Sequence, residues 1–354
     1  MIRIGMMTFL HNDNYGSILQ AWALQQTLLD MGFDATHIDY VPSKQEKIRN
    51  LLLSGNSPKL ILEGMRKKSA TSKMHGGFDE FRKENIRATA PCRDHAALKN
   101  VAADFDVLVC GSDQIWSPVW LNPAYFLDFT DRPKVSYAPS LGVKDMPNGM
   151  KRRKIAKLVK KFSAVSVREQ EGANLLVEME GVEPVIMPDP VMLVDKETWQ
   201  SIMDQHVPQG KYVLCYFIGD NPSYWETVAA VAQREGCEVR VIPRTEEARN
   251  SGYILEEDVP PQRWLGLING AAHVVTDSFH GATFSAILNK ECTIVRRYRE
   301  DDPESKNSRI DQLLRNLGVN SLNNADWDVV NRNLAVKADS AKSWLKNAIN
   351  QAKT

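Results

Sequence analysis

The sequence is poor in cysteine and has no long apolar run. Its five cysteines are widely spaced among 354 residues. This spacing fits neither a disulfide framework nor a zinc site, so we expect reduced thiols in a cytoplasmic protein. No uninterrupted apolar run reaches the roughly 18 residues of a membrane-spanning helix. A basic segment followed by an apolar one is also missing from the start of the sequence, so we expect no signal peptide.

An excess of charge of either sign is also lacking. Lys plus Arg and Asp plus Glu both number 44, so the formal net charge is zero. This balance argues against a nucleic-acid-binding protein, which is usually basic. With 25% charged and 43% hydrophobic residues, the composition is typical of a globular protein. A chain of this length is too long for one ordinary core and suits two domains.

Short apolar strands alternate with amphipathic helices, which predicts an α/β chain with parallel sheets. The motif Pro188-Asp189-Pro190 interrupts this alternation, and a second alternating series begins near residue 212. We therefore predict two Rossmann-like domains, residues 1–195 and 196–354, that face a cleft and are followed by a C-terminal helix from Asp326. The strands are expected at residues 2–9, 36–41, 107–111, 135–138, 164–167, 184–187, 212–218, 238–242, 273–276 and 293–295.

A basic stretch interrupts the first domain from about residue 44 to residue 100. Between Lys44 and Lys73 it carries eight Lys or Arg residues and two Glu residues, with leucine clusters among them. Such a segment can lie on an anionic membrane surface, which would make the protein peripheral at the inner face of the cytoplasmic membrane. The alternative, which we favour, is a solvated helical lid whose leucines pack on the domain.

The stretch from Val274 to Ser285 is the most informative part of the chain. It reads as a buried strand that ends in Asp277 and Ser278 and turns at Gly281 into a helix. Ligands of open α/β sheets bind where strands end, and helix N-termini bind anions. His280 at this turn is therefore a candidate acid beside an anion; a histidine that caps the helix or bonds the next loop is the alternative.

Two further loops follow predicted strands and carry groups that hydrogen-bond sugars. The first contains His11, Asn14 and Tyr15 and has neither a dinucleotide-binding nor a P-loop pattern; a purely structural turn is the alternative. The second contains Asp113, Gln114 and Trp116, where the indole can stack on sugar C–H groups and the polar pair can bind hydroxyls. Helix capping and core packing of the indole are the alternative there.

Cationic side chains occur at other strand ends and helix starts. Arg168 ends a strand and can form a two-pronged contact to phosphate or carboxylate; an ion pair with Glu169 or Asp189 is the alternative. Lys306 and Arg309 begin another predicted helix. Arg296 and Arg297 lie shortly before it.

These motifs, taken in order, resemble the polysaccharide pyruvyl transferase family over roughly residues 1–320. The resemblance implies a GT-B-like fold and transfer of pyruvate from phosphoenolpyruvate to two hydroxyls of one sugar, with a cyclic ketal as product and phosphate as leaving group. It implies that His280 is the acid and that Arg168 binds the donor. The motifs are His11-Asn12 to Ala21, Gly111 to Trp116, Ser136 to Ser140, Ser166 to Glu169, Pro188 to Val191, Thr276 to Gly281 and Asn307 to Ile310.

One position departs from the family pattern. Several members resemble Arg-Leu-His-Gly at the turn, whereas this chain has Ser278-Phe279-His280-Gly281, so a donor arginine is missing and another cation must supply its charge. The expected donor-binding residues are Arg168, Ser278, Gly281, Arg296, Lys306 and Arg309, with Arg297 as a further nearby cation. Asp113 or His11 is expected to orient or deprotonate the acceptor, and the expected acceptor contacts are Asn14, Tyr15, Gln114 and Trp116.

The expected partners are phosphoenolpyruvate and a glycan or lipid-linked oligosaccharide. No metal or cofactor is expected, because Asp and His residues do not cluster at ligand spacing and arginines with helix N-termini can meet both anionic groups of the donor. Two alternatives stay open. A GT-B glycosyltransferase would use a nucleotide sugar in the same cleft, and a non-catalytic glycan-binding protein would keep the fold without turnover.

Overall fold

The structure is a computed structural model that describes residues 1–54, 75–146, 149–179, 182–297 and 308–353. Most of the basic residues predicted to form a membrane surface or lid, among them Lys59, Arg66 and Lys73, lie outside the described residues, as does Lys306. Within the described residues, no helix is both long and apolar enough to cross a lipid bilayer.

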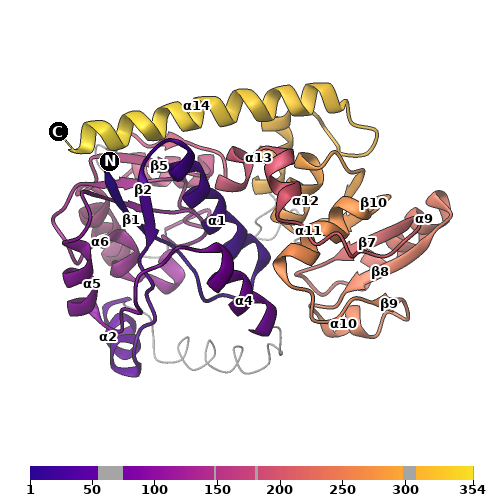
Figure 1. The fold of residues 1–354 in the computed structure, drawn as a ribbon, viewed down its shortest axis with the longest axis horizontal. Helices are drawn as coiled ribbons and strands as arrows, with labels where there is room; N and C mark the ends of the chain where they lie inside the picture. Colours follow the sequence, from indigo (N-terminus) through magenta and orange to yellow (C-terminus); the bar gives the residue numbers. More distant parts are fainter. Residues whose placement is uncertain (55–74, 147–148, 180–181, 298–307, 354) are drawn as a thin grey trace. The chain divides into compact units, whose positions relative to one another are not determined.

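The chain divides into two units, each built on one parallel sheet (Figure 1). Unit 1 comprises Met1–Lys73, Arg82–Leu193 and Asp339–Thr354, and unit 2 comprises Met74–Phe81 and Val194–Ala338. The division at Leu193 lies two residues from the predicted boundary. Two segments depart from the predicted 1–195 and 196–354 domains, because residues 74–81 belong to unit 2 and residues 339–354 to unit 1.

Unit 1 contains a six-stranded sheet in the order β2-β1-β3-β4-β5-β6, with every neighbouring pair parallel. Its central strand β3 is buried at all four positions, as expected for a parallel sheet covered on both faces. The strands are β1 (Arg3–Met7), β2 (Asp34–His37), β3 (Val107–Cys110), β4 (Lys134–Ser136), β5 (Ala164–Val167) and β6 (Val185–Ile186). The helices are α1 (Tyr15–Asp30), α2 (Lys44–Ser54), α5 (His95–Ala102), η1 (Pro118–Trp120), η2 (Pro123–Phe126), α6 (Gly149–Val159), α7 (Gln170–Val177) and η3 (Pro190–Leu193).

Unit 2 contains a five-stranded parallel sheet in the order β11-β10-β7-β8-β9. Its strands are β7 (Tyr212–Tyr216), β8 (Glu238–Ile242), β9 (Ile254–Leu255), β10 (His273–Thr276) and β11 (Cys292–Ile294). Its helices are α8 (Lys196–Ser201), α9 (Tyr224–Glu235), α10 (Glu246–Arg249), α11 (Pro261–Gly270), α12 (Phe279–Ile287) and α13 (Ser308–Leu317). Residues of α4 (His75–Asn85) and α14 (Trp327–Lys353) are shared between the two units.

The predicted strands occur in the structure with shifted ends, and one strand was missed. The second strand ends at His37, not at residue 41, because the chain then pairs through isolated bridges with Ala88 and Cys92. The unpredicted strand β9 has only two residues, too few for a periodic pattern.

Each sheet reverses its strand order at one place. In unit 1 the chain passes from β1 to the edge strand β2 and then returns to the other side of β1, so the switch point lies between β1 and β3. In unit 2 the chain runs outward through β8 and β9 and then returns to β10 on the other side of β7, so the switch point lies between β7 and β10. Open α/β sheets bind ligands beyond the carboxyl ends of the strands at such points.

Candidate active site

Asp113 is held at the switch point of unit 1, in the loop after β3. Its backbone is left-handed, with φ of 63°, a conformation that Asp tolerates better than most residues. One carboxylate oxygen accepts the Gln114 backbone N–H at 2.7 Å, and the other accepts the Ser17 hydroxyl at the start of α1. The carboxylate therefore links the loop after β3 to the helix that follows β1.

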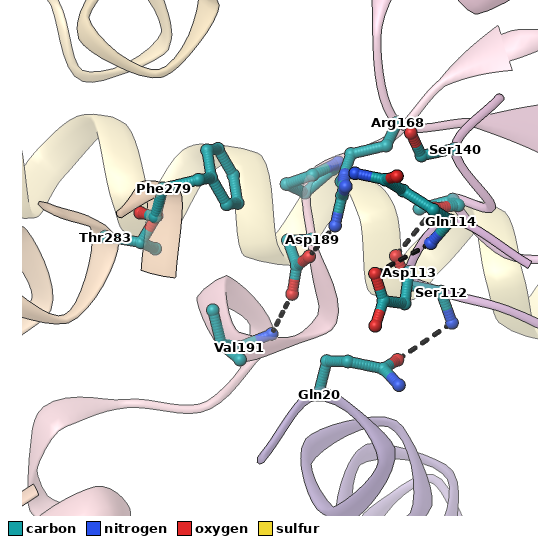
Figure 2. Close-up of polar contacts among 12 residues, drawn as sticks. Gln20, Ser112, Asp113, Gln114, Ser140, Arg168, Asp189, Val191, Phe279 and Thr283 are labelled. Atoms are coloured by element: carbon teal, nitrogen blue, oxygen red, sulfur yellow. Dashed lines mark hydrogen bonds and ion pairs between the residues drawn. The ribbon is translucent and has the colours of Figure 1, made fainter. Parts of the chain in front are cut away.

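Buried polar contacts fix the two loops to each other. The Ser112 backbone N–H donates to Gln20 Oε1 at 2.8 Å (Figure 2), and Gln20 Nε2 donates to the Thr8 hydroxyl at 2.9 Å. Thr8 Oγ1 in turn donates to the Ser112 carbonyl at 3.2 Å. Asn14 caps α1, with its side chain accepting the Ser17 backbone N–H at 3.3 Å. The loops are thus rigid before any ligand arrives.

Arg168 is buried in unit 1, with its side chain only 4% exposed, and forms the ion pairs that the sequence left as an alternative. Its Nη1 donates to Asp189 Oδ2 at 2.6 Å, and its Nε lies 3.4 Å from Glu169 Oε2 (Figure 2 shows the Asp189 contact). Burial lowers the pKa of Arg168, but the carboxylates of Asp189, Glu169 and Asp113 outweigh it and raise the pKa above its ordinary value. The guanidinium thus ties the end of β5 to the segment after β6.

His11 forms a short contact with Asp39 at the carboxyl ends of β1 and β2. Nε2 of His11 lies 2.5 Å from Asp39 Oδ1, and the histidine side chain is 43% exposed. The preceding carbonyl, that of Leu10, accepts a hydrogen bond from Arg82 at 3.1 Å. The histidine therefore presents its ring to solvent from a loop that is held on both sides.

Two of the predicted acceptor contacts lie in the interior, which corrects that prediction. The side chain of Trp116 is fully buried, stacks on Phe126 with ring centroids 5.0 Å apart, and donates to the Tyr125 carbonyl. Tyr15 is buried in α1. Core packing, the alternative for Trp116, accounts for that ring, and Tyr15 packs as the first residue of α1.

Trp120 is an exposed aromatic side chain that sequence reasoning missed. It is 47% exposed in η1, and its Nε1 donates to the Gln114 carbonyl at 3.2 Å. The predicted contact Gln114 is partly buried, and its side chain lies against Gly142. The sequence Pro118-Val119-Trp120 carried a local signal, because a proline at this position begins a short helix, and this helix holds Trp120.

In unit 2, Asp277 occupies the switch point between β7 and β10. Its two carboxylate oxygens accept the backbone N–H groups of Ile218 and Gly219, both at 2.7 Å. Arg297 Nε also donates to Oδ2 at 2.9 Å. The side chain therefore joins the ends of three strands, because Ile218 and Gly219 follow β7 and Arg297 follows β11.

The turn after Asp277 has the predicted strand-to-helix form. Ser278 caps α12 by accepting the Gly281 backbone N–H at 3.3 Å. A Cβ atom at Gly281 would lie 2.6 Å from the Thr276 hydroxyl oxygen, so packing requires glycine there. His280 lies in the first turn of α12 and is partly buried, with its ring edge-on to Phe279 at 5.2 Å between centroids. Ser278 thus caps the helix, and Gly281 permits close packing against Thr276.

A cavity of about 190 Å³ lies beside this turn, within unit 2. Three arginines line it: Arg297 bonded to Asp277, Arg296 paired with Asp311 at 2.8 Å, and Arg309 from the first turn of α13. Asp277 and Phe279 also line it. The cavity therefore combines three positive charges with the turn that carries His280.

Metal ligands do not gather in the described parts of the chain. Among those residues there is no cluster of three or more His, Cys, Asp or Glu side chains that could hold a metal ion.

Solved structures similar to this chain share its fold. A UDP-N-acetylglucosamine 2-epimerase from Rickettsia bellii matches with a TM-score of 0.53 and 8% identity, over 100% of this chain and 97% of that one. The Neisseria meningitidis UDP-GlcNAc 2-epimerase, bound to UDP-GlcNAc, matches with a TM-score of 0.51 and 10% identity, over 99% and 100% of the two chains. These likenesses confirm the predicted GT-B fold class.

Family membership rests on sequence. None of the curated proteins matches this chain. The family model of polysaccharide pyruvyl transferases, however, matches residues 14–297, a range that includes Asp113, Arg168, His280 and Arg297. Because the match covers most of the sequence and both switch points, the chain belongs to the polysaccharide pyruvyl transferase family.

Proposed function

We propose that this protein transfers pyruvate from phosphoenolpyruvate to two hydroxyls of one sugar in a glycan or lipid-linked oligosaccharide, forming a cyclic ketal and releasing phosphate. The observation that carries the proposal is the position of His280, at a helix N-terminus on a switch point, next to an arginine-lined cavity. A site of this kind suits an acid that acts on a small dianion or trianion.

The reaction begins with protonation of the enol. His280 donates a proton to the methylene carbon of phosphoenolpyruvate, and the double-bond electrons form the new C–H bond. The neighbouring C2 becomes an oxocarbenium-like centre that a sugar hydroxyl attacks. Phosphate then leaves with the electrons of its C2–O bond, and the second hydroxyl closes the ring. General acid catalysis of such a step contributes about 10²–10⁴-fold.

Unit 2 is proposed to bind the donor. Ser278 stands where several family members carry arginine, and Arg297 and Arg309 supply the missing positive charge from the adjacent cavity. An arginine fork suits both the carboxylate and the phosphate of phosphoenolpyruvate. Arg168 has a different proposed role: since its guanidinium already bonds two carboxylates, it positions the loops of unit 1.

Unit 1 is proposed to bind the acceptor. Trp120 offers an exposed indole for the apolar face of a sugar, as Trp116 was expected to do. Gln114 and Asp113 lie in the same loop as hydrogen-bonding groups, and Asn14 lies across the switch point at the start of α1. Aromatic stacking beside a few fixed polar groups is the usual composition of a small-molecule site.

The test is phosphate release from phosphoenolpyruvate across a panel of glycans, with wild type and His280→Ala compared. We expect glycan-dependent release in the wild type and a loss of about 10²–10⁴-fold in the variant, with an unchanged melting temperature. Galactose-, mannose-, glucuronate- and N-acetylhexosamine-terminated acceptors cover the main hydroxyl arrangements. Stabilisation by uridine nucleotides without any response to phosphoenolpyruvate would instead indicate glycosyl transfer, and glycan binding without turnover of any donor would indicate a binding protein.

A further inference from the structure

The pair formed by His11 and Asp39 has the geometry of an oriented base. Nε2 of His11 lies 2.5 Å from Asp39 Oδ1, so the imidazole N–H and the carboxylate oxygen are in direct hydrogen-bonding contact. A carboxylate can only accept, so Nε2 is the ring nitrogen that carries the proton of this contact, and in the neutral ring Nδ1 keeps its lone pair. Among the described residues, Nδ1 of His11 has no hydrogen-bond partner. The ring is thus held in the tautomer that can remove a proton.

The backbone on both sides of the pair is fixed. Asp39 donates its N–H to the Thr89 hydroxyl at 3.1 Å and accepts the Cys92 N–H at 2.7 Å. Arg82 donates to the Leu10 carbonyl next to His11 and lies 3.9 Å from the Asp13 carboxylate. Asp39 also acts electrostatically on the buried His37. Among the described residues, Arg82, Asp13, His37 and Cys92 are charged or titratable groups around the pair.

Asp113, the other candidate base, is less available. Both of its carboxylate oxygens already accept hydrogen bonds, one from Ser17 Oγ and one from the Gln114 N–H. It also lies close enough to the Arg168 guanidinium to raise the pKa of that group. A carboxylate engaged in this way is a poorer proton acceptor than an exposed imidazole nitrogen.

Two other histidine–aspartate pairs occur in the described residues, and neither joins the ends of two strands. Nε2 of His95, at the start of α5, is 3.2 Å from Asp128, and Nδ1 of His206 is 3.1 Å from Asp204 in the loop after α8. Only the pair of His11 and Asp39 joins the carboxyl ends of two neighbouring strands at the edge where α/β sheets bind ligands. Its place in the fold, not its composition, distinguishes it.

We propose that Nδ1 of His11 removes the proton from each attacking hydroxyl of the acceptor and that Asp39 is the positioning residue which holds its tautomer. The inference rests on the proposed function, since it assigns the base of that reaction. As the hydroxyl oxygen bonds to C2, its proton passes to Nδ1. Two hydroxyl protons are released in all; one replaces the proton given to the methylene carbon and the other leaves with the phosphate, so the transfer balances.

The experiment measures acceptor-dependent phosphate release for the wild type, His11→Gln, Asp39→Asn and the matched control Asp128→Asn. We expect His11→Gln to lower kcat by about 10²–10⁴-fold. In a Ser-His-Asp triad, reversing the histidine tautomer lowers kcat by about 10⁴-fold. The pair of His11 and Asp39 is more exposed, so we expect Asp39→Asn to lower kcat by only about 10–100-fold. The control keeps wild-type kcat, and all variants keep the wild-type KM for phosphoenolpyruvate.

The pH–rate profile separates a base from a merely structural pair. If Nδ1 of His11 is the base, the wild-type kcat should fall on the acidic side of the profile. This acidic limb should disappear in His11→Gln and move in Asp39→Asn. Wild-type kcat and an unchanged profile in both variants would overturn the assignment of the base while leaving pyruvyl transfer intact. No turnover of phosphoenolpyruvate by the wild type would remove the proposed function and, with it, this assignment.

A second measurement does not depend on turnover. Long-range ¹H–¹⁵N NMR spectra report the tautomer of each histidine ring. We expect His11 as the Nε2–H tautomer at pH 8 in the wild type and a shift toward Nδ1–H in Asp39→Asn. A mixed tautomer already present in the wild type would mean that Asp39 does not position the ring. The wild-type spectrum still tests the tautomer if a variant is too unstable for kinetics.

Discussion

The guanidinium of Arg168 donates to the Asp189 carboxylate at 2.6 Å, with both side chains buried in unit 1. Removing one partner of such a pair leaves an uncompensated buried charge, which typically costs about 3–5 kcal/mol. We therefore expect Asp189→Asn and Arg168→Met each to lower the free energy of unfolding by about that amount, measured by urea titration. A fully stable Arg168→Met that had lost only its affinity for phosphoenolpyruvate would make Arg168 a donor ligand instead.

The arginines of the unit 2 cavity should bind the donor unequally. Hydrogen bonds to charged groups contribute about 1.5–3 kcal/mol, so Arg309→Met should raise the KM for phosphoenolpyruvate by about 10–100-fold. Arg296 is exposed and paired with Asp311 at the rim, and we expect Arg296→Met to change that KM by less than about threefold. Equal effects of the two substitutions would argue against a specific donor contact by Arg309.

Two tryptophans four residues apart should respond in opposite ways to replacement by alanine. Trp120→Ala removes an exposed ring, so we expect unchanged stability and a raised KM for the glycan, with the KM for phosphoenolpyruvate unaltered. Trp116→Ala opens the core, which typically costs about 3–5 kcal/mol. Kinetics with both substrates and thermal denaturation separate the two. An unchanged KM for the glycan in Trp120→Ala would exclude sugar stacking. If that KM rises in Trp120→Ala, a Trp120→Phe variant with an equally raised KM would exclude it too.

Mild acid should destabilise unit 1 through His37. Burial lowers the pKa of this fully buried histidine to about 4, although a hydrogen bond with the Ala21 carbonyl and the Asp39 charge partly oppose it. The unfolded chain gains the proton near pH 6.5 and the folded chain near 4, so stability falls as the pH drops between those values. The slope is about 1.4 kcal/mol per pH unit.

Urea titrations of the wild type and His37→Gln at pH 7 and pH 5 measure this contribution. The variant cannot gain the proton, so its free energy of unfolding should depend less on pH over this range. Parallel losses of stability in the two proteins would assign the acid sensitivity to other groups. His273 in unit 2, whose pKa burial also lowers to about 4, is the first of these to examine by the same substitution.

Much of the fold followed from local pattern. The period of the apolar residues predicted the strands and the long C-terminal helix, because each element must bury one face whatever its neighbours are. The order of the motifs also indicated the family that residues 14–297 match. The two-residue strand β9 was missed because its existence depends on pairing with β8.

What only the tertiary structure decided is which polar groups meet and which aromatic rings are buried. The sequence by itself could not tell which of Trp116 and Trp120 is buried, because burial depends on the elements that pack on each ring. Asp39 is separated from His11 by 28 positions and reaches it only because β1 and β2 are neighbours in register. Arg168 likewise reaches Asp189, in addition to its neighbour Glu169, because β6 lies beside β5. The sequence therefore determines which chemical groups are available, whereas long-range strand pairing determines which of them lie close together.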